Sequence, residues 1–219
     1  MNLNSVRVGA VLTLLVLFFV VSPSTTSAMY LVNNPNSSNQ KYIPIDSRVL
    51  VLKSYLTEQN SPLKDYASEI IAEADKNEID WRLLPTIAAV ESRFGQVIPY
   101  GKGSDDALSH NAWGWGVHSG RKLYFDSWEQ GIEKVSFGLK TKFVDLGLDT
   151  PAKMNPKYSS NPEWTSMVEY YIADLNTFEK DFMQKYGSRI EAYNRRVPEL
   201  NLKSQLSFRL NSNEINFHF

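Results

Sequence analysis

The chain has 219 residues and a formal net charge of −1, with 23 lysines and arginines against 24 aspartates and glutamates. No block of basic residues supplies the electrostatic footprint that phosphate backbones require, so nucleic acid is excluded as an expected partner. With 42% hydrophobic residues and no cysteine, the chain can build a sizeable core but no disulfide, thiolate nucleophile or cysteine-ligated metal.

The N-terminus has the pattern of an export signal. Arg7 precedes an apolar stretch over residues 8–21, and the small residues Thr26 to Ala28 follow it. A stretch of about 14 residues is shorter than the roughly 20 that span a bilayer, and small residues suit signal peptidase. We expect a signal peptide over residues 1–28. If it is not cleaved, residues 8–21 would serve as a membrane tether, and in both cases the protein is extracytoplasmic: periplasmic, wall-associated or secreted.

Residues 29–60 are expected to form a linker and a short N-terminal element. Residues 33–40 are almost all Asn, Ser and Gln, a composition that buries too little apolar surface to order itself. Residues 45–58 contain the apolar run Val49 to Leu52, which has no clear period. Helix and strand therefore remain equally open for this element.

Strong helical signals begin at Ser61, which is followed by proline in the first turn of an apolar stripe. A second helix is expected from near Asp80, with Pro85 at or near its start and Gly95 as its C-terminal stop. Residues 96–111 are expected to form a loop. The alternating residues 113–117, a turn at 118–121 and the apolar residues 123–125 then predict a small β-hairpin.

Two further helices are expected. Ser127 with Gln130 three residues later forms a capping box, and the helix that it opens should end at Gly147. A longer amphipathic helix opens at residues 161–162 and should end at Gly187. The main domain is therefore placed at residues 61–187. Residues 188–219 form a C-terminal extension, which we expect to be loosely held beyond Val197.

Glu91 is the candidate acid that the helical period selects. On a helical wheel centred on Ile87, Glu91 falls about 40° away, inside the stripe formed by Leu84, Val90 and Phe94. An inward-facing carboxyl loses hydration, which raises its pKa, and a neutral acid can protonate a leaving oxygen. The alternative is that Glu91 lies at the edge of the stripe and pairs with a lysine or arginine.

Trp113 and Trp115 are candidate platforms for sugar rings. Each is flanked by glycine or a small residue, and flat indole faces suit the C–H faces of pyranose rings. The alternative is that they fill the local core, and in a strand the two would share one face. Asn111 could bind an N-acetyl group or simply form a turn.

Metal and other catalytic classes lack a starting set of residues. The histidines His110, His118 and His218 match no zinc spacing. No nucleophile elbow and no phosphate-binding glycine loop is present. We therefore expect no metal and no cofactor.

Four short motifs follow one another along the helical part of the chain. They are residues 88–95 (AAVESRFG), residues 111–114 (NAWG), residues 125–132 (FDSWEQGI) and Tyr158 with residues 162–164. The first resembles the A-x-E-S-x-x-G helix of lysozyme-like peptidoglycan hydrolases, in which the Glu-Ser pair carries the catalytic acid. The others resemble the N-x-F-G, F-x-S … S-I and Y-x-x-x-P-x-Y segments of the glucosaminidase branch, whose domain is similar to mannosyl-glycoprotein endo-β-N-acetylglucosaminidase. The similarity covers about residues 62 to 186.

The resemblance implies a mainly α (α+β) lysozyme-like domain, with a β-hairpin lobe and a glycan groove between the lobe and the Glu91 helix. It implies that Glu91 cleaves β-1,4 bonds in peptidoglycan glycan strands. The residues expected to bind the substrate are Ser92, Asn111, Trp113, Trp115 and Tyr158. Trp113 and Trp164 stand where the family more often has Phe and Tyr.

The second acid stays open among Asp105, Asp106 and Asp126. A retaining enzyme needs a carboxylate about 5 Å from the acid, an inverting enzyme needs one roughly 6.5 to 9.5 Å away, and assistance by the substrate's N-acetyl group needs none. Lytic transglycosylases, which form anhydromuramic ends, usually carry a G-L-M-Q segment after the Glu-Ser helix, and this chain has none. We therefore expect hydrolysis, with transglycosylation and a non-catalytic wall-binding module as the alternatives.

Overall fold

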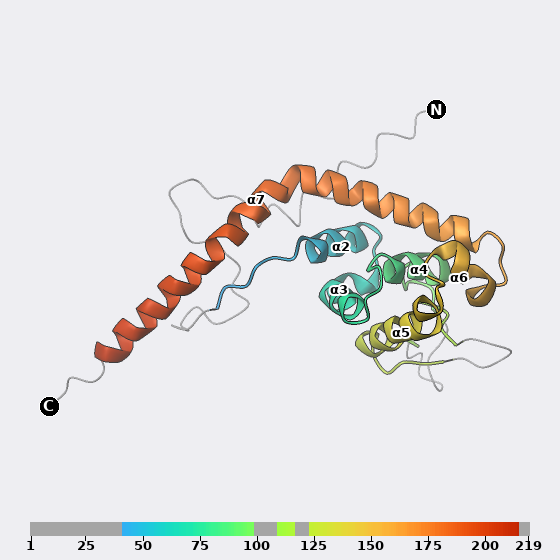
Figure 1. Ribbon diagram of the computed structural model, residues 1–219, viewed down its shortest axis with the longest axis horizontal. Helices are drawn as coiled ribbons and strands as arrows, with labels where there is room; N and C mark the ends of the chain where they lie inside the picture. Colours follow the sequence, from blue (N-terminus) through green and yellow to red (C-terminus); the bar gives the residue numbers. More distant parts are fainter. Residues whose placement is uncertain (1–40, 99–108, 117–122, 215–219) are drawn as a thin grey trace. The chain divides into compact units, whose positions relative to one another are not determined.

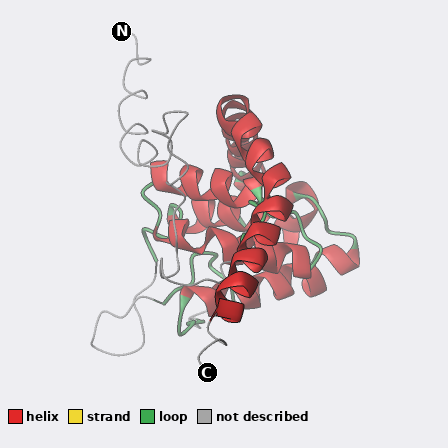
Figure 2. Cartoon of the chain, turned by 90° about the vertical axis from the view of Figure 1, so that its left-hand side faces the viewer, coloured by secondary structure: helices red, strands yellow, loops and turns green. Residues whose placement is uncertain are grey.

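The computed structural model describes residues 41–98, 109–116 and 123–214, and this part of the chain is mainly helical (Figure 1). Figure 2 shows helices and loops but no strand within those residues. The elements, in chain order, are α2 (Ser47–Glu58), η2 (Pro62–Tyr66), α3 (Ala67–Lys76), α4 (Leu83–Ser92), α5 (Trp128–Lys142), η3 (Val144–Leu146), α6 (Pro151–Tyr158) and α7 (Trp164–Glu214).

The chain divides into two compact units. One is Asp46–Gly187, and the other combines the residues on either side of it. Helix α7 contributes its first half to the larger unit and its second half to the smaller one. Within the described ranges, the search for a helix long and apolar enough to cross a membrane finds none. Residues 1–28, where the signal peptide is expected, lie outside those ranges.

The core of the larger unit is built around α4. Every residue of α4 from Leu83 to Ala89 is buried, so this short helix is covered on all sides. Helix α5 packs against both α3 and α4, and α2 packs against α3. A helix that is buried all round must be apolar all round, which fits its sequence LLPTIAAV. Glu91 is the only charged residue of α4.

Residues 47–58 form a helix, which settles the choice between helix and strand. Asp46 caps it by accepting a hydrogen bond from the Arg48 backbone N–H. The buried side chains of α2 are Val51, Leu52, Tyr55 and Leu56. These side chains belong to the core, and the compact unit begins at Asp46, so α2 is the short element expected within residues 29–60.

Ser61 and Ser127 cap the helices that they were expected to open, but two of the expected helix ends are wrong. Ser61 caps η2 with proline behind it, and Ser127 caps α5 by accepting from the Gln130 N–H at 3.3 Å. Helix α5 ends at Lys142 rather than Gly147, because a separate short turn, η3, occupies the interval and ends at Gly147. Helix α7 continues past Gly187 to Glu214, so residues 188–214 of the C-terminal extension are helical.

The expected β-hairpin is not found in the described residues of that segment. Residues 109–116 and 123–127 contain turns and no strand, while the tip at residues 117–122 lies outside the described ranges. Gly114 has φ +58°, a left-handed conformation that breaks an extended strand. The Asn111 side chain replaces the strand ladder: its amide donates to the carbonyls of Trp115 at 2.8 Å and Leu123 at 3.0 Å.

The smaller unit contains an asparagine clasp, which we define as Asn194 and Asn201 of α7 holding residues 42–45. The Asn201 amide both accepts from the Tyr42 N–H at 2.6 Å and donates to the Tyr42 carbonyl at 2.9 Å. Asn194 does the same with Ile45, at 2.7 and 2.9 Å. Seven helical residues rise about 10.5 Å, which matches three residues of extended chain at about 3.3 Å each.

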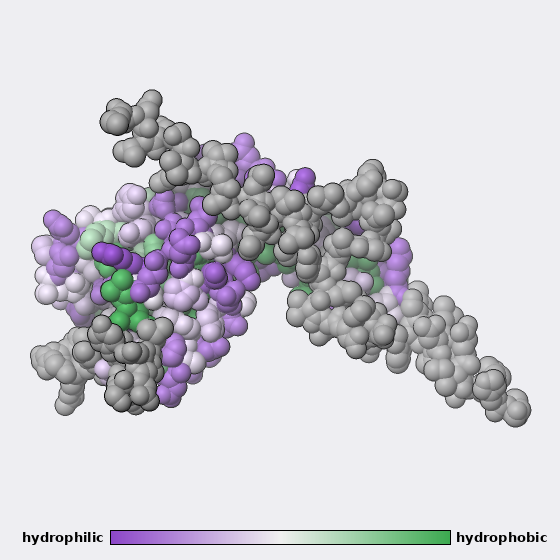
Figure 3. Space-filling model, turned by 180° about the vertical axis from the view of Figure 1, so that it is seen from behind, coloured by the Kyte–Doolittle hydropathy of each residue, from purple (hydrophilic) through white to green (hydrophobic). Residues whose placement is uncertain are grey.

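Figure 3 shows one face of the molecule as mostly hydrophilic or neutral, with hydrophobic residues only in small patches. Two of the exposed apolar side chains, Val97 and Leu123, lie next to the undescribed segments 99–108 and 117–122. Their exposure therefore does not define an interaction surface.

Candidate functional site

Glu91 lies in the last turn of α4, and its carboxyl group is held between two other segments. The indole N–H of Trp164, at the start of α7, donates to Oε1 at 2.8 Å. The other oxygen, Oε2, lies beside Gly114, so closely that a Cβ atom on that glycine would be 2.9 Å from it. The residue as a whole keeps an exposed surface, although its carboxyl group is partly desolvated.

The surroundings favour the protonated form of this carboxyl. Burial raises the pKa of Glu91 above its ordinary value, and the Trp164 hydrogen bond lowers it by a lesser amount. Among the described residues, no lysine or arginine forms an ion pair with Glu91. Within the described residues, Glu91 is therefore not paired with a lysine or arginine, as the alternative interpretation required. A carboxyl that is raised in pKa and open to solvent is suited to donate a proton.

Tyr158 links the acid to the loop that carries the tryptophans. Its ring stacks on the Trp164 indole, with centroids 4.8 Å apart, and its hydroxyl donates to the Trp113 carbonyl at 2.8 Å. Burial, and secondarily the Glu91 charge, hold the pKa of Tyr158 well above its ordinary value. The hydroxyl is thus a neutral donor that fixes the loop against α6.

Trp113 is a core residue, which overturns its expected role as a solvent-facing sugar platform. Its side chain is fully buried, and the indole N–H donates to the Leu84 carbonyl of α4 at 2.9 Å. Its ring lies against Gly131 of α5, where an added Cβ would be 2.9 Å from it. A buried indole with a satisfied N–H packs against the core and offers no face to a ligand.

Trp115 occupies a different environment and remains the candidate platform. It is half-buried, and its ring packs on Gly138 of α5, at a distance that leaves no room for a Cβ atom there. Its centroid lies 5.8 Å from that of Tyr158 and 6.1 Å from that of Phe143. We call Trp115, Phe143, Tyr158 and Trp164 the aromatic cluster, and it leads from α5 to Glu91.

Ser92 and Asn111, which were expected to bind the substrate, are buried and bonded within the protein. The Ser92 hydroxyl lies 2.7 Å from the Ala112 carbonyl and accepts from the Gly95 N–H at 2.8 Å. The Asn111 side chain is buried, and both its amide hydrogens and its oxygen are used within the loop. Both side chains are buried, and every donor hydrogen that they carry is used within the protein.

Of the three candidates for the second acid, only Asp126 lies within the described residues. Asp105 and Asp106 lie in the undescribed segment 99–108. Asp126 is exposed and serves the start of α5: its backbone N–H donates to Gln130 Oε1 at 2.8 Å, and its carboxylate accepts from the same amide at 3.3 Å. No group of three His, Asp or Glu residues in the described ranges could hold a metal ion.

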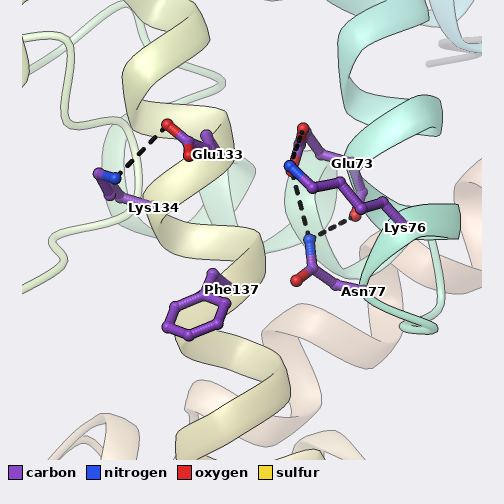
Figure 4. A pocket seen from close by; sticks show the side chains of 6 residues that line it. All are labelled: Glu73, Lys76, Asn77, Glu133, Lys134 and Phe137. Atoms are coloured by element: carbon purple, nitrogen blue, oxygen red, sulfur yellow. Dashed lines mark hydrogen bonds and ion pairs between the residues drawn. The ribbon is translucent and has the colours of Figure 1, made fainter.

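A separate hollow of about 200 Å³ lies between α3 and α5 (Figure 4). Its charged side chains pair locally, Glu73 with Lys76 at 2.9 Å and Glu133 with Lys134 at 3.5 Å. Asn77 is bonded to the Glu73 carbonyl, and exposed Phe137 forms the rim. None of the residues expected to act on a substrate lines this hollow.

Two contributors to the site were not assigned a role from the sequence. Trp164 was placed only on the α7 stripe and in the fourth motif, and Gly114 only as a spacer between tryptophans. The sequence signal for Gly114 is the spacing of the glycines of α5: Gly131 and Gly138, seven apart, share one helical face and receive Trp113 and Trp115. This docking brings the intervening Gly114 against Glu91.

Comparison of the chain with known protein families found no family profile that matches it, and comparison with curated proteins found no relative.

Proposed function

We propose that this protein is an exported glycosidase that cleaves β-1,4 bonds in the glycan strands of peptidoglycan, with Glu91 as the general acid. The proposal includes a lysozyme-like arrangement of the larger unit and an extracytoplasmic location. It rests on the motif resemblance together with one observation: Glu91 combines a raised pKa, an exposed side and no basic partner among the described residues.

The proposed step begins with proton transfer from Glu91 to the bridging glycosidic oxygen. The C–O bond then breaks, the leaving sugar keeps the proton as a hydroxyl group, and the other sugar becomes an oxocarbenium-like centre. Trp164 bonds Oε1 and thereby stabilises the carboxylate that remains after transfer. In hydrolysis water adds to the sugar centre and gives a proton to the Glu91 carboxylate, which restores the acid. Attack by the sugar's own hydroxyl, with the same return of a proton, would give an anhydro end.

Support for the acid role comes from how the carboxyl group is held. Proton transfer needs a donor fixed within hydrogen-bond reach of the leaving oxygen. Trp164 fixes one oxygen and Gly114 leaves room for the other, so the carboxyl has one orientation relative to the exposed side of the site. Since Glu91 is the only charged residue of α4, no other side chain of this helix can take its role.

The test is Glu91→Gln assayed on purified peptidoglycan, with release of reducing ends and mass spectrometry of the products. The amide keeps the shape and the acceptor oxygen for Trp164 but carries no transferable proton. We expect activity to fall on the order of 10² to 10⁴. The control is Glu169→Gln, which removes an exposed carboxylate from α7 and should retain wild-type activity. Glu91→Asp should also fail, because the carboxyl is withdrawn by one methylene.

Two further readouts accompany this test. Wild-type activity should decline as pH rises through the raised pKa of Glu91, because only the protonated form donates. The Tm of Glu91→Gln at neutral pH should not fall, since the variant lacks a charge that burial penalises. Near-normal cleavage by Glu91→Gln would refute the proposal. Anhydro ends in the products would identify transglycosylation, and wall binding without any cleavage by the wild type would identify a binding module.

A further inference from the structure

Two lysines border the aromatic cluster. Lys142 Nζ lies 5.5 Å from the centre of the Trp115 ring, and Lys157 Nζ lies 5.1 Å from the centre of the Phe143 ring. They come from different helices, α5 and α6, and are joined because Lys157 Nζ donates to the Lys142 carbonyl at 2.7 Å. Both side chains are exposed, so Lys142 borders the half-buried indole of Trp115 and Lys157 borders the neighbouring ring of Phe143.

Neighbouring lysines of the same helices differ in one respect. Lys140 of α5 pairs with Asp145 at 3.4 Å, and Lys153 of α6 pairs with Asp149 at 2.7 Å. Lys142 and Lys157 form no ion pair with any acidic side chain in the described part of the chain. Local acids thus neutralise the lysines that face away from the cluster, while the pair beside Trp115 keeps its charge for a ligand.

The position of this pair relative to Glu91 follows from the backbone. Trp115 comes directly after Gly114, which touches the Glu91 carboxyl. On the other side, Trp115 contacts Tyr158, and Tyr158 stacks on the Trp164 that bonds Glu91. A sugar ring that contacts the exposed part of Trp115 would therefore lie near the sugar whose bond Glu91 would break, with Lys142 beside it and Lys157 bonded to the Lys142 carbonyl.

We infer that Lys142 and Lys157 form a carboxylate-binding subsite that makes the enzyme prefer glycan with an acidic substituent on the sugar at Trp115. This inference rests on the proposed function. Two sources in peptidoglycan supply such a group: the lactyl ether of a muramic sugar from which the peptide has been removed, and the carboxylates of an intact stem peptide. If the lysines only packed on the aromatic rings, replacing them would change the affinities for neutral and acidic glycans equally.

The experiment measures binding in the Glu91→Gln background, so that no turnover is needed. Calorimetric titrations use three tetrasaccharide ligands: a neutral N-acetylglucosamine oligomer, a peptide-free glucosamine–muramic acid oligomer and the same oligomer with stem peptides. We expect tighter binding of an acidic ligand, with a difference that shrinks at high salt. Lys142→Gln and Lys157→Gln should each weaken acidic-ligand binding about three- to fivefold, as exposed charge pairs do, and leave the neutral oligomer unchanged.

Lys153→Gln is the matched control, because it removes the same charge from the same helix as Lys157 but from a lysine that Asp149 already pairs. It should leave all three affinities unchanged. Preference for the peptide-free ligand identifies the lactyl carboxylate, and preference for the peptide-bearing ligand identifies the stem. Equal losses on neutral and acidic ligands, or no loss, would overturn the inference. If the wild type cleaves peptidoglycan but the protein binds acidic and neutral ligands equally well, the inference fails and the proposed function stands. If the protein prefers acidic ligands but the wild type cleaves nothing, only the proposed function is refuted.

Discussion

The Trp113→Ala variant distinguishes a core indole from a sugar platform. Trp113 is fully buried, its N–H is bonded to Leu84, and its ring fills the space above Gly131. Removing a buried aromatic side chain costs about 3 to 5 kcal/mol through lost transfer energy and the cavity left behind. The free energy of unfolding of a whole domain is only about 5 to 15 kcal/mol. This single change should therefore lower the free energy of unfolding of the larger unit by a large fraction.

The expected shift can be stated as a temperature. For a chain of this size, about 1 kcal/mol corresponds to roughly 2 to 4 °C in Tm, so a loss of about 4 kcal/mol predicts a fall of roughly 8 to 16 °C. Trp113→Phe keeps most of the volume and loses the bond to the Leu84 carbonyl, which should cost about 1 to 2 kcal/mol. Thermal and urea unfolding, followed by circular dichroism, measure both.

Trp115→Ala is the matched comparison, since this indole is half-buried and packs on the corresponding glycine of α5. It should lower the Tm less than Trp113→Ala while weakening glycan binding more, because its ring borders the exposed side of the site. The reasoning would be refuted if Trp113→Ala unfolded within about 2 °C of the wild type and lost its affinity for glycan. That result would mean that the Trp113 indole faces the ligand.

Two further predictions concern backbone geometry. Gly114→Ala should lower activity at least tenfold, because its Cβ would lie 2.9 Å from Oε2 of the proposed acid. The control is Gly147→Ala, which introduces similar backbone strain at φ +76° but has nothing within 4 Å of its Cβ, and it should keep a normal kcat. Equal activities of the two variants would contradict the steric argument. The double variant Asn194→Ala/Asn201→Ala should release residues 41–45 from α7, since it removes all four clasp hydrogen bonds. Hydrogen exchange of those residues should then rise, and unchanged protection would show that the clasp does not hold them.

Structural features that depend on contacts within one helical turn could be predicted from the sequence. Ser61 and Ser127 each cap the helix that follows them, because a side-chain oxygen reaches a backbone N–H two or three residues away. The apolar period also placed Glu91 among buried neighbours. By contrast, the apolar run Val49 to Leu52 showed no period because apolar residues also occupy positions outside the buried face of α2, which consists of Val51, Leu52, Tyr55 and Leu56.

The loop after α4 could not be predicted, because its conformation depends on residues far away in the sequence. The alternation of tryptophan and glycine at 113–116 resembles a strand, yet Gly114 adopts a left-handed φ and the two indoles dock separately at Gly131 and Gly138. Whether an indole is a platform or core is decided by this docking. Local sequence carries no information on which helix face will have the room to receive it.

The turn that follows Glu91 is strained, and the contacts around it account for its persistence. Arg93 and Phe94 have φ values of 52° and 59°, and a left-handed conformation costs a residue with a side chain roughly 1 to 2 kcal/mol. Burial of the Phe94 ring against Tyr55 offsets this cost, and the Ser92 hydroxyl joins the turn to the Ala112 carbonyl. Ser92 is the last residue of α4, so its hydroxyl holds the tryptophan loop at the helix end, and Gly114 of that loop lies against the carboxyl of Glu91. The proposed acid would thus be oriented by contacts that meet where α4 ends and the left-handed turn begins.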